Sequence, residues 1–327
     1  MHGKVDRKLI EILRILNEQS APVGARVIAK KLRERGYILD ERTVRYHLRI
    51  LDERGFTKNL GYAGRMITEK GLEEVKNALV TDRVGFIITK IESLIFKMDF
   101  SLEKRKGKVI ANVATLNREH LKKALQLMKK VISAGYCVSP YVKIADEGEH
   151  LGSHTVPEGK AMVATMCSIT LDGILHHSGV PVAPRFGGVV QVANNKPMRF
   201  TELISYSGST LDPLELFSAK GLNSVLNVVR TGNGYVLANL REIPMDALSA
   251  AVETLKKAKE AGICGLMVFG EPNMPVLGVP VGINKVGIAF IGGTNPLAGV
   301  SEAGIPIETK AIDCLVNFEE MTHIEEL

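Results

Sequence analysis

The fold of the N-terminal region is decided by residues 40–51, which read Asp40-Glu41-Arg42-Thr43-Val44-Arg45-Tyr46-His47-Leu48-Arg49-Ile50-Leu51. Val44, Leu48 and Leu51 share one face of a helix that Asp40 caps. The other face carries residue types that contact phosphates and base edges in the DNA major groove. These candidate DNA-binding residues are Arg42, Thr43, Arg45, Tyr46 and Arg49. The pattern predicts a recognition helix.

The flanking sequence predicts the elements that accompany such a helix. Apolar residues at helical spacing indicate two helices before it, one near residues 9–16 and a second that buries Ile28 and Leu32 and ends at Gly36. After it, residues 56–68 read as a hairpin that turns at 60–64 and carries Lys58 and Arg65 on its arms. A fourth helix starts near Glu69. This order resembles the winged helix-turn-helix family, so we expect residues 1–80 to bind DNA. The alternative is a charged helical bundle used for protein contacts.

The charge distribution supports a polyanionic partner. The 327 residues carry a formal net charge of +6. Residues 1–80 hold 17 Lys and Arg against 11 Asp and Glu, whereas residues 81–327 hold 25 of each. Lysines and arginines near phosphates release condensed counterions, which favours binding to nucleic acid. We therefore expect double-stranded DNA as a partner.

The composition excludes several other classes. With 45% apolar and 24% charged residues, the chain can bury a core and is not disordered. No apolar run is long enough to span a membrane, so we expect a soluble, cytoplasmic protein with no membrane partner. The four cysteines form no C-x-x-C pair, and His150 and His154 have no cysteine nearby. These features favour buried thiols and no metal site.

Residues 81–103 form an apolar connector. Ile87, Ile91, Leu94 and Ile95 fall on one helical face, which is too apolar for a solvated linker. This face packs either on a second copy of the chain or on the chain's own second domain. A homodimer is expected in either case, because winged-helix readers usually bind two half-sites related by two-fold symmetry.

The rest of the chain contains an internal duplication. Residues 107–137 align without gaps on residues 234–264, with 11 identities in 31 positions, and weaker similarity continues beyond. Each copy predicts a hairpin turning near residues 104–107 or 230–234, then a helix over residues 118–133 or 245–260. A strand follows each helix, then an apolar strand at 161–168 or 286–291 and a short helix near Thr170 or Asn295. The fold class is therefore α+β, with a winged helix followed by an α+β effector domain at 104–327. Its related halves are 104–190 and 222–320.

A pseudo-two-fold arrangement of this kind tends to leave a cleft between the halves, where we expect a small-molecule ligand. Glycine pairs, hydroxyls and helix starts favour anions, and Arg185 can pair with a carboxylate. The candidate ligand residues are His176, His177, Arg185, Ser207, Gly208, Ser209, Thr210, Gly292, Gly293, Thr294 and Asn295. Each also has an ordinary interpretation as a tight turn, a helix cap or a solvated side chain.

Together these regions resemble the archaeal nitrogen-regulatory repressor family NrpR. The resemblance is carried by segments 83–86, 107–110, 177–182, 185–188 and 205–213. It implies a dimeric transcriptional repressor of nitrogen-assimilation genes that 2-oxoglutarate releases from palindromic operators. Some family members carry two effector domains, whereas this chain has one, so the resemblance also allows a second family member as partner.

Two rival functions remain at the level of sequence. An enzyme fused to a winged helix is disfavoured, because neither a G-x-S-x-G nor a G-x-x-x-x-G-K-[ST] motif is present and no cofactor is expected. A regulator that senses another ligand, such as a nucleotide, an amino acid or a metal, stays open, because an anion site accepts phosphate or carboxylate alike.

Overall fold

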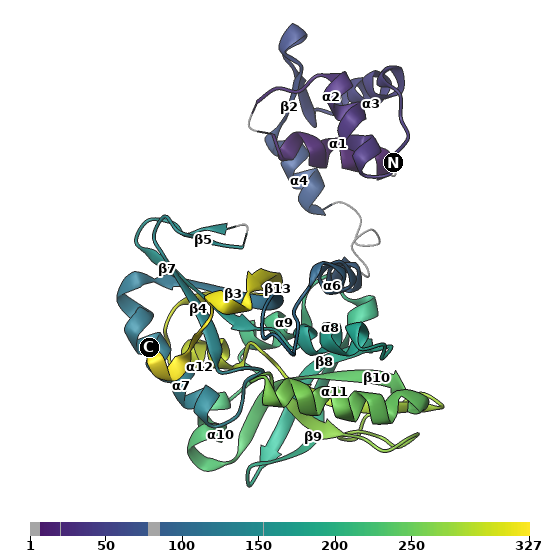
Figure 1. Ribbon diagram of the computed structural model, residues 1–327. Helices are drawn as coiled ribbons and strands as arrows, with labels where there is room; N and C mark the ends of the chain where they lie inside the picture. The colour runs from purple at the N-terminus through teal and green to yellow at the C-terminus, as the bar shows by residue number, and fades with distance from the viewer. Residues whose placement is uncertain (1–6, 20, 78–85, 153) are drawn as a thin grey trace. The chain divides into compact units, whose positions relative to one another are not determined.

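A computed structural model describes residues 7–19, 21–77, 86–152 and 154–327 (Figure 1). The chain divides into two compact units, Met1–Arg83 and Val84–Leu327. We call these the N-terminal unit and the C-terminal unit. The first residues of the predicted connector, 81–85, lie outside the described residues, as does most of the 83–86 segment that carries part of the family resemblance.

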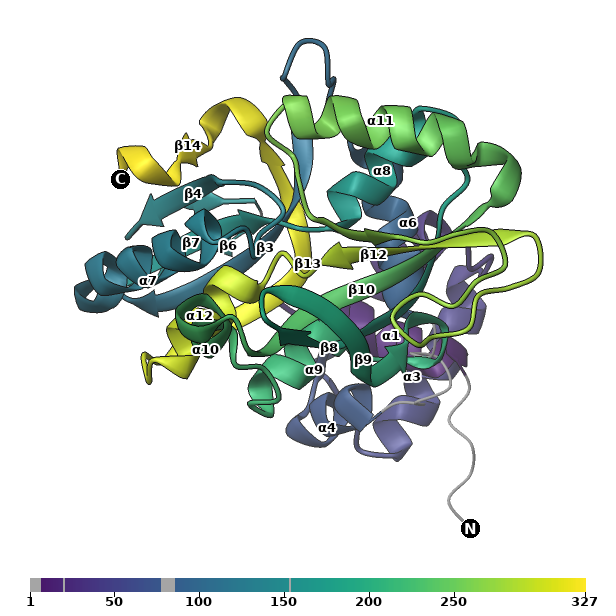
Figure 2. The same ribbon diagram turned by 90° about the horizontal axis from the view of Figure 1, so that it is seen from below.

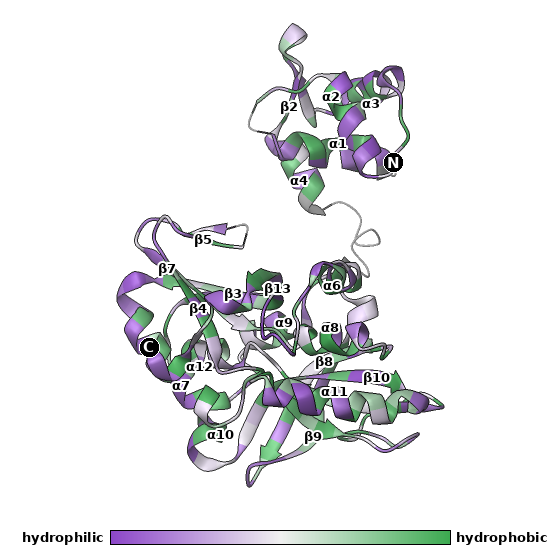
Figure 3. Ribbon diagram, viewed as in Figure 1, coloured by the Kyte–Doolittle hydropathy of each residue, from purple (hydrophilic) through white to green (hydrophobic). Residues whose placement is uncertain are grey.

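The N-terminal unit has the predicted winged-helix order. Its elements are α1 (Arg7–Asn17), α2 (Ala25–Glu34), α3 (Glu41–Glu53), β1 (Thr57–Asn59), β2 (Arg65–Ile67) and α4 (Glu69–Asn77), with a 3-10 turn at Gly61–Ala63 between the strands. Leu32, Val44 and Leu48 have no exposed surface. Hydrophobic and hydrophilic residues alternate along these helices, as amphipathic packing requires (Figure 3).

The wing is fixed to the body by backbone contacts. Val23 and Arg65 exchange two backbone hydrogen bonds of 3.0 Å, so the loop before α2 extends the β1–β2 hairpin. Gly64, at φ +109°, lies against this loop, and a Cβ there would approach the Val23 carbonyl carbon to 2.4 Å. Only glycine fits this position.

The C-terminal unit begins with α6 (Phe86–Lys97) and contains two five-stranded antiparallel sheets. The first half supplies β3 (Lys108–Asn117), α7 (Leu121–Ser133), β4 (Tyr141–Asp146), β7 (Lys160–Met166), α8 (Ile169–His177) and β8 (Ala183–Ala193). The second half supplies the counterparts β10 (Gly234–Pro244), α11 (Leu248–Glu260), β11 (Leu266–Phe269), β12 (Lys285–Ile291), α12 (Asn295–Glu302) and β13 (Ile307–Asn317). The other elements are β5 (His150–Leu151), β6 (His154–Thr155), β9 (Lys196–Ser205), α9 (Pro213–Ala219), α10 (Val225–Thr231) and β14 (Thr322–His323).

The halves exchange their last strands. One sheet has the order β13-β3-β7-β4-β14, and the other has the order β11-β12-β10-β8-β9. Thus β13 of the second half lies beside β3 of the first, and β8 of the first lies beside β10 of the second (Figure 2). Neither half can complete its own sheet.

The connector helix α6 packs on the chain's own domain. Ile87, Ile91 and Ile95 are buried in a core shared with α8, where they meet residues such as Ile174. The apolar face of α6 therefore packs on the chain's own second domain, which was one of the two alternatives left open by the sequence. Phe96, on another side of the helix, is 86% exposed.

One detail of the predicted repeat is wrong. The sequence predicts a hairpin before Gly234, but residues 225–231 form the helix α10, which ends at Gly232 in the left-handed conformation. In the first half, Ser101 and Lys106 do form an isolated bridge before β3. The hairpin predicted before β3 is therefore present as this bridge, whereas the hairpin predicted before β10 is replaced by a helix.

Candidate DNA-binding surface and ligand-binding residues

The outward face of α3 has the exposure that a recognition helix needs. Asp40 caps the helix by accepting a 2.7 Å hydrogen bond from the Thr43 backbone N–H, and this bond lowers the pKa of its carboxyl. Arg42, Arg45 and Arg49 are exposed, and the Tyr46 ring is 60% exposed. Arg45 is held by an ion pair with Glu41, one turn earlier. Thr43 is half-buried.

The two predicted wing residues differ in their surroundings. Lys58, on β1, is exposed. Arg65, on β2, donates a 2.8 Å hydrogen bond from Nε to Asp52 Oδ2, and Asp52 Oδ1 accepts a 2.5 Å bond from the Thr57 hydroxyl. Arg65 thus fixes the wing to α3, which gives it a structural role that the sequence did not reveal. The sequence also missed Tyr62, which is fully exposed at the wing tip.

The candidate ligand residues of the second half are buried at the contact between the halves. Gly293 packs so closely that a Cβ would lie 2.1 Å from the Met166 carbonyl oxygen. Its own carbonyl oxygen accepts a 2.8 Å bond from the Thr165 hydroxyl. Thr294 is 2% exposed. The halves therefore touch directly where a cleft was expected.

Asn295 serves as a clamp between α12 and β10. Its Oδ1 accepts from the Leu237 N–H at 2.9 Å, and its Nδ2 donates to the carbonyl oxygens of Leu237 and Gly292 at 2.9 and 3.0 Å. The side chain is fully buried. Both N–H donors and one acceptor site of the amide are used inside the chain, so the structure gives Asn295 a packing role.

The first half has the same clamp in another residue type. Thr170 Oγ1 accepts from the Ile110 N–H and donates to the Ile110 carbonyl oxygen, both at 3.0 Å. Ile110 aligns with Leu237 in the duplication. A threonine hydroxyl and an asparagine amide thus bind equivalent backbone groups at equivalent helix starts.

A buried polar network crosses the contact between the halves. Arg241 of β10 donates from Nε to both carboxylate oxygens of Asp172 in α8, at 2.8 and 2.7 Å, and both side chains are fully buried. The Arg241 guanidinium lies 5.5 Å from the centre of the Tyr206 ring. Tyr206 donates a 2.5 Å bond to Asn239, whose Nδ2 donates to Ser168. The sequence signal for this network was Arg241, the one basic residue in a largely apolar strand.

The loop at residues 207–210 lies near a group of carboxylates. Ser207 and Gly208 are exposed, and Ser209 and Thr210 are half-buried. Burial raises the pKa of Asp212 to about 6, with backbone hydrogen bonds and Lys90 opposing the change. Burial also raises the pKa of Glu215 to about 7, while its bond from the Ala311 N–H and the charge of Lys90 oppose this. Carboxyl groups with raised pKa values near neutral pH are candidate functional groups.

The remaining ligand candidates lie elsewhere. His176 and His177 are exposed at the end of α8, and His177 lines a cavity of about 260 Å³ with Ser101, Glu103 and Lys257. Arg185 is half exposed and its Nε lies 3.4 Å from Glu242. The structure therefore does not gather the eleven candidates into one site.

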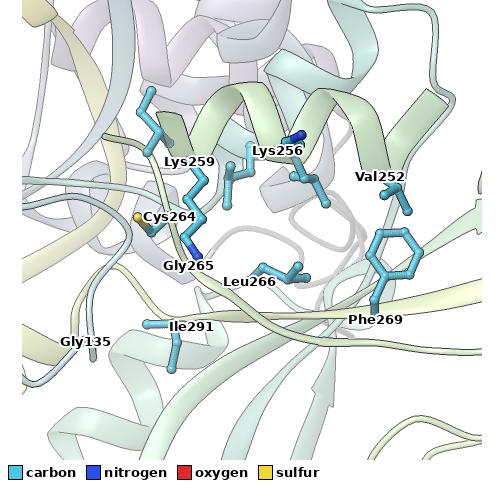
Figure 4. Close-up of a pocket in the computed structure, with 12 residues that line it drawn as sticks. Gly135, Val252, Lys256, Lys259, Cys264, Gly265, Leu266, Phe269 and Ile291 are labelled. Carbon is cyan, nitrogen blue, oxygen red and sulfur yellow. The ribbon is translucent and has the colours of Figure 1, made fainter. Parts of the chain in front are cut away.

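A larger cavity was not anticipated from the sequence. It has a volume of about 430 Å³ and lies between α11 and β11. Lys256 and Lys259 extend from α11 on one side, and Leu266, Phe269 and Ile291 lie on the other (Figure 4).

The sequence predicts neither a metal site nor a membrane span, and the structure bears on both only within the residues that it describes. Among those residues, no group of three or more His, Cys, Asp and Glu could hold a metal ion. His154 instead pairs with Asp313 at 2.7 Å, and His150 contacts the Thr155 hydroxyl. In the same ranges, every helix is too short or too polar to cross a membrane.

Each unit is similar to a known protein family. Residues 84–323 match the family model "NrpR regulatory domains NRD1 and 2", and residues 10–75 match the Ribonuclease R winged-helix domain. A crystal structure of a nitrogen repressor-like protein from Methanococcus jannaschii covers 73% of this chain and 98% of its own, with 30% identity and a TM-score of 0.62.

Full-length relatives carry consistent names. The global nitrogen regulator NrpRI of Methanosarcina mazei is 43% identical over 99% of this chain and 100% of its own length. The global nitrogen regulators NrpR of Methanococcus maripaludis and Methanocaldococcus jannaschii are 35% and 37% identical, and the chain spans 54% and 55% of their lengths. The chain belongs to the NrpR family of global nitrogen regulators.

Proposed function

We propose that this protein is a transcriptional repressor that binds palindromic operators of nitrogen-assimilation genes as a homodimer and is released by 2-oxoglutarate. The observation that carries the DNA-binding part is the exposed basic face of α3, with Arg42, Arg45 and Arg49 on the side opposite a fully buried apolar face. Guanidinium groups in this arrangement suit both phosphates and guanine edges.

The effector part rests on the loop at residues 207–210 and its neighbours. The 3-10 turn at Tyr206–Gly208 contacts α6, the first helix of the C-terminal unit. Hydroxyls of Ser207 and Thr210 and the ammonium group of Lys90 would bind the carboxylates of 2-oxoglutarate, and protonated Glu215 would donate a further bond. The Ser209 hydroxyl already donates to the Leu211 carbonyl oxygen and holds the shape of the loop. Because α6 follows the residues that join the two units, a ligand here would act next to that joint. To relieve repression, it must bind the released state more tightly than the DNA-bound state.

DNA binding is tested by fluorescence anisotropy with a labelled palindromic fragment from upstream of a nitrogen-assimilation gene. Arg42→Ala, Arg45→Ala and Arg49→Ala should each weaken binding by roughly 5- to 150-fold where a base contact is lost, corresponding to about 1–3 kcal/mol. If the replaced arginine contacts a phosphate, its variant should instead show a plot of log K against log salt whose slope is smaller in magnitude by about one. Lys123→Ala, an exposed lysine on α7, is the control. Unchanged affinity in all three arginine variants would move the interface off α3.

The effector is tested by adding 2-oxoglutarate to the same complex, with glutamine and a nucleotide as comparisons. Wild-type protein should release DNA, whereas Lys90→Gln and Thr210→Val should bind DNA normally and respond only at higher 2-oxoglutarate concentrations. Loss of the response in His177→Ala alone would instead place the effector in the cavity beside Lys257. If a different compound releases the DNA, the protein would still be a repressor, but its effector would be that compound and not 2-oxoglutarate.

A further inference from the structure

Among the residues that the structure describes, none pairs with the outer edge of β11. Within the described residues this strand pairs only with β12, at the end of its sheet. Leu266, on β11, is 46% exposed. The cavity of about 430 Å³ lies directly beside this edge, under α11. An open strand edge next to an apolar cavity is a template for adding another strand.

The first half shows how the corresponding place is filled. Its counterpart strand β4 pairs on the outer side with β14, and the Ile324 N–H donates a 3.0 Å bond to the Pro140 carbonyl oxygen. Ile324 is 2% exposed and packs in the core under α7. Val142 of β4, which pairs with β7 as Leu266 pairs with β12, is fully buried. The segment at residues 318–327 therefore covers the groove between α7 and β4, which we call the first groove.

Charge helps to hold that cover. Lys129 of α7 forms a 2.6 Å ion pair with Glu325, and Lys143 of β4 forms an ion pair with Glu320. Lys129 aligns with Lys256 in the duplication. The second groove, between α11 and β11, thus has Lys256 at the position of Lys129 and also has Lys259. Its floor is apolar and is formed by Leu255, Ile263 and Ile291.

We infer that the groove between α11 and β11 binds an extended acidic peptide segment of a partner protein, with one aliphatic side chain in the cavity and a carboxylate paired with Lys256. The segment adds a strand to the edge of β11, as β14 does to β4. The C-terminal segment of a second copy is a poorer occupant, because it would have to leave its own groove. This partner site is separate from the DNA-binding face of α3 and from the loop at residues 207–210.

The probe is a labelled synthetic peptide with the sequence of residues 317–327, Asn-Phe-Glu-Glu-Met-Thr-His-Ile-Glu-Glu-Leu, because this sequence already fits the first groove. Binding to the full chain is measured by fluorescence anisotropy. We expect saturable binding that Lys256→Glu weakens by about tenfold or more. Lys257→Glu is the matched control, since it makes the same charge change one position along α11 at a lysine that does not line this cavity. Replacing the isoleucine of the peptide by aspartate should abolish binding.

Hydrogen exchange locates the bound peptide. The amides of β11 should gain protection when it binds, while those of β4 should not change. Several results would overturn the inference: no saturable binding to wild-type protein, equal loss in both lysine variants, or loss in Lys129→Glu with Lys256→Glu unaffected. The last would mean exchange with the chain's own C-terminal segment. Displacement of the peptide by 2-oxoglutarate, together with loss of the 2-oxoglutarate response in Lys256→Glu, would make the groove a small-anion site instead.

Discussion

The two halves of the C-terminal unit keep one contact and differ in another. Both clamp a helix start to the backbone of a neighbouring strand, through Thr170 in one half and Asn295 in the other. Only one half supplies an arginine in the first strand of its repeat, β10, and in β3 Ala114 stands at the position that aligns with Arg241. The shared clamp reflects what the fold requires of each copy, whereas the buried Asp172–Arg241 pair reflects a requirement that arises once, where the copies meet.

Breaking the unshared contact should have the largest effect. Asp172→Ala leaves the Arg241 guanidinium buried without its partner, which should lower the free energy of unfolding by about 3–5 kcal/mol. Urea denaturation followed by circular dichroism measures this. Replacing both residues by apolar side chains, Asp172→Leu with Arg241→Met, should recover most of the loss, since buried ion pairs are often no more stabilising than packed hydrocarbon. A double variant as unstable as the single one would show that the pair itself is required.

The shared contact should give smaller and unequal losses. Thr170→Val and Asn295→Ala each leave a backbone N–H in a buried strand without its side-chain acceptor, at a cost of about 1–3 kcal/mol. Asn295→Ala should be the more severe, because Asn295 makes three hydrogen bonds to backbone groups and Thr170 makes two. The same urea titration compares them. If both variants are as stable as the wild type, the clamp is not what holds the helices.

A third effect should come from pH. The pKa of Glu215 is raised to about 7 in the folded protein, chiefly by burial, above the value of about 4.3 expected when the chain unfolds. The folded state then binds this proton more tightly, so its contribution to stability is full below the unfolded pKa and is lost as the pH rises through about 7. Asp212, raised to about 6, acts in the same direction. The urea midpoint of wild-type protein should fall between pH 5 and 8, and Glu215→Gln should flatten the profile. An unchanged slope would contradict this.

The sequence predicted what local pattern encodes. Val44, Leu48 and Leu51 indicated a buried helix face because helical spacing is visible within about two turns of sequence. Likewise, α7 and α11 occupy the same aligned positions of the duplication, 121–133 and 248–260. Individual elements and their amphipathic faces could therefore be read directly.

The sequence did not predict what depends on distant partners. The exchange of β8 and β13 leaves no trace in either repeat, because each strand has the same apolar pattern whichever sheet receives it. Gly292-Gly293 has the composition of an anion-binding turn, yet the nearest obstacle to a side chain at Gly293 is the Met166 carbonyl oxygen of the other half. Arg65 looked like a free wing cation, and only the fold places it beside Asp52.

The exchanged strands also have a consequence for synthesis of the protein on the ribosome. Strand β3 emerges early, but its neighbour β13 follows about 200 residues later, as the bond between Ile312 and Asn112 illustrates. At about 5–20 residues per second, one side of β3 waits roughly 10–40 s for its partner. During that time the apolar run Val109-Ile110-Ala111-Asn112-Val113 is open to pairing with other nascent chains. That edge of β3 can be closed only when translation has passed the end of the second half.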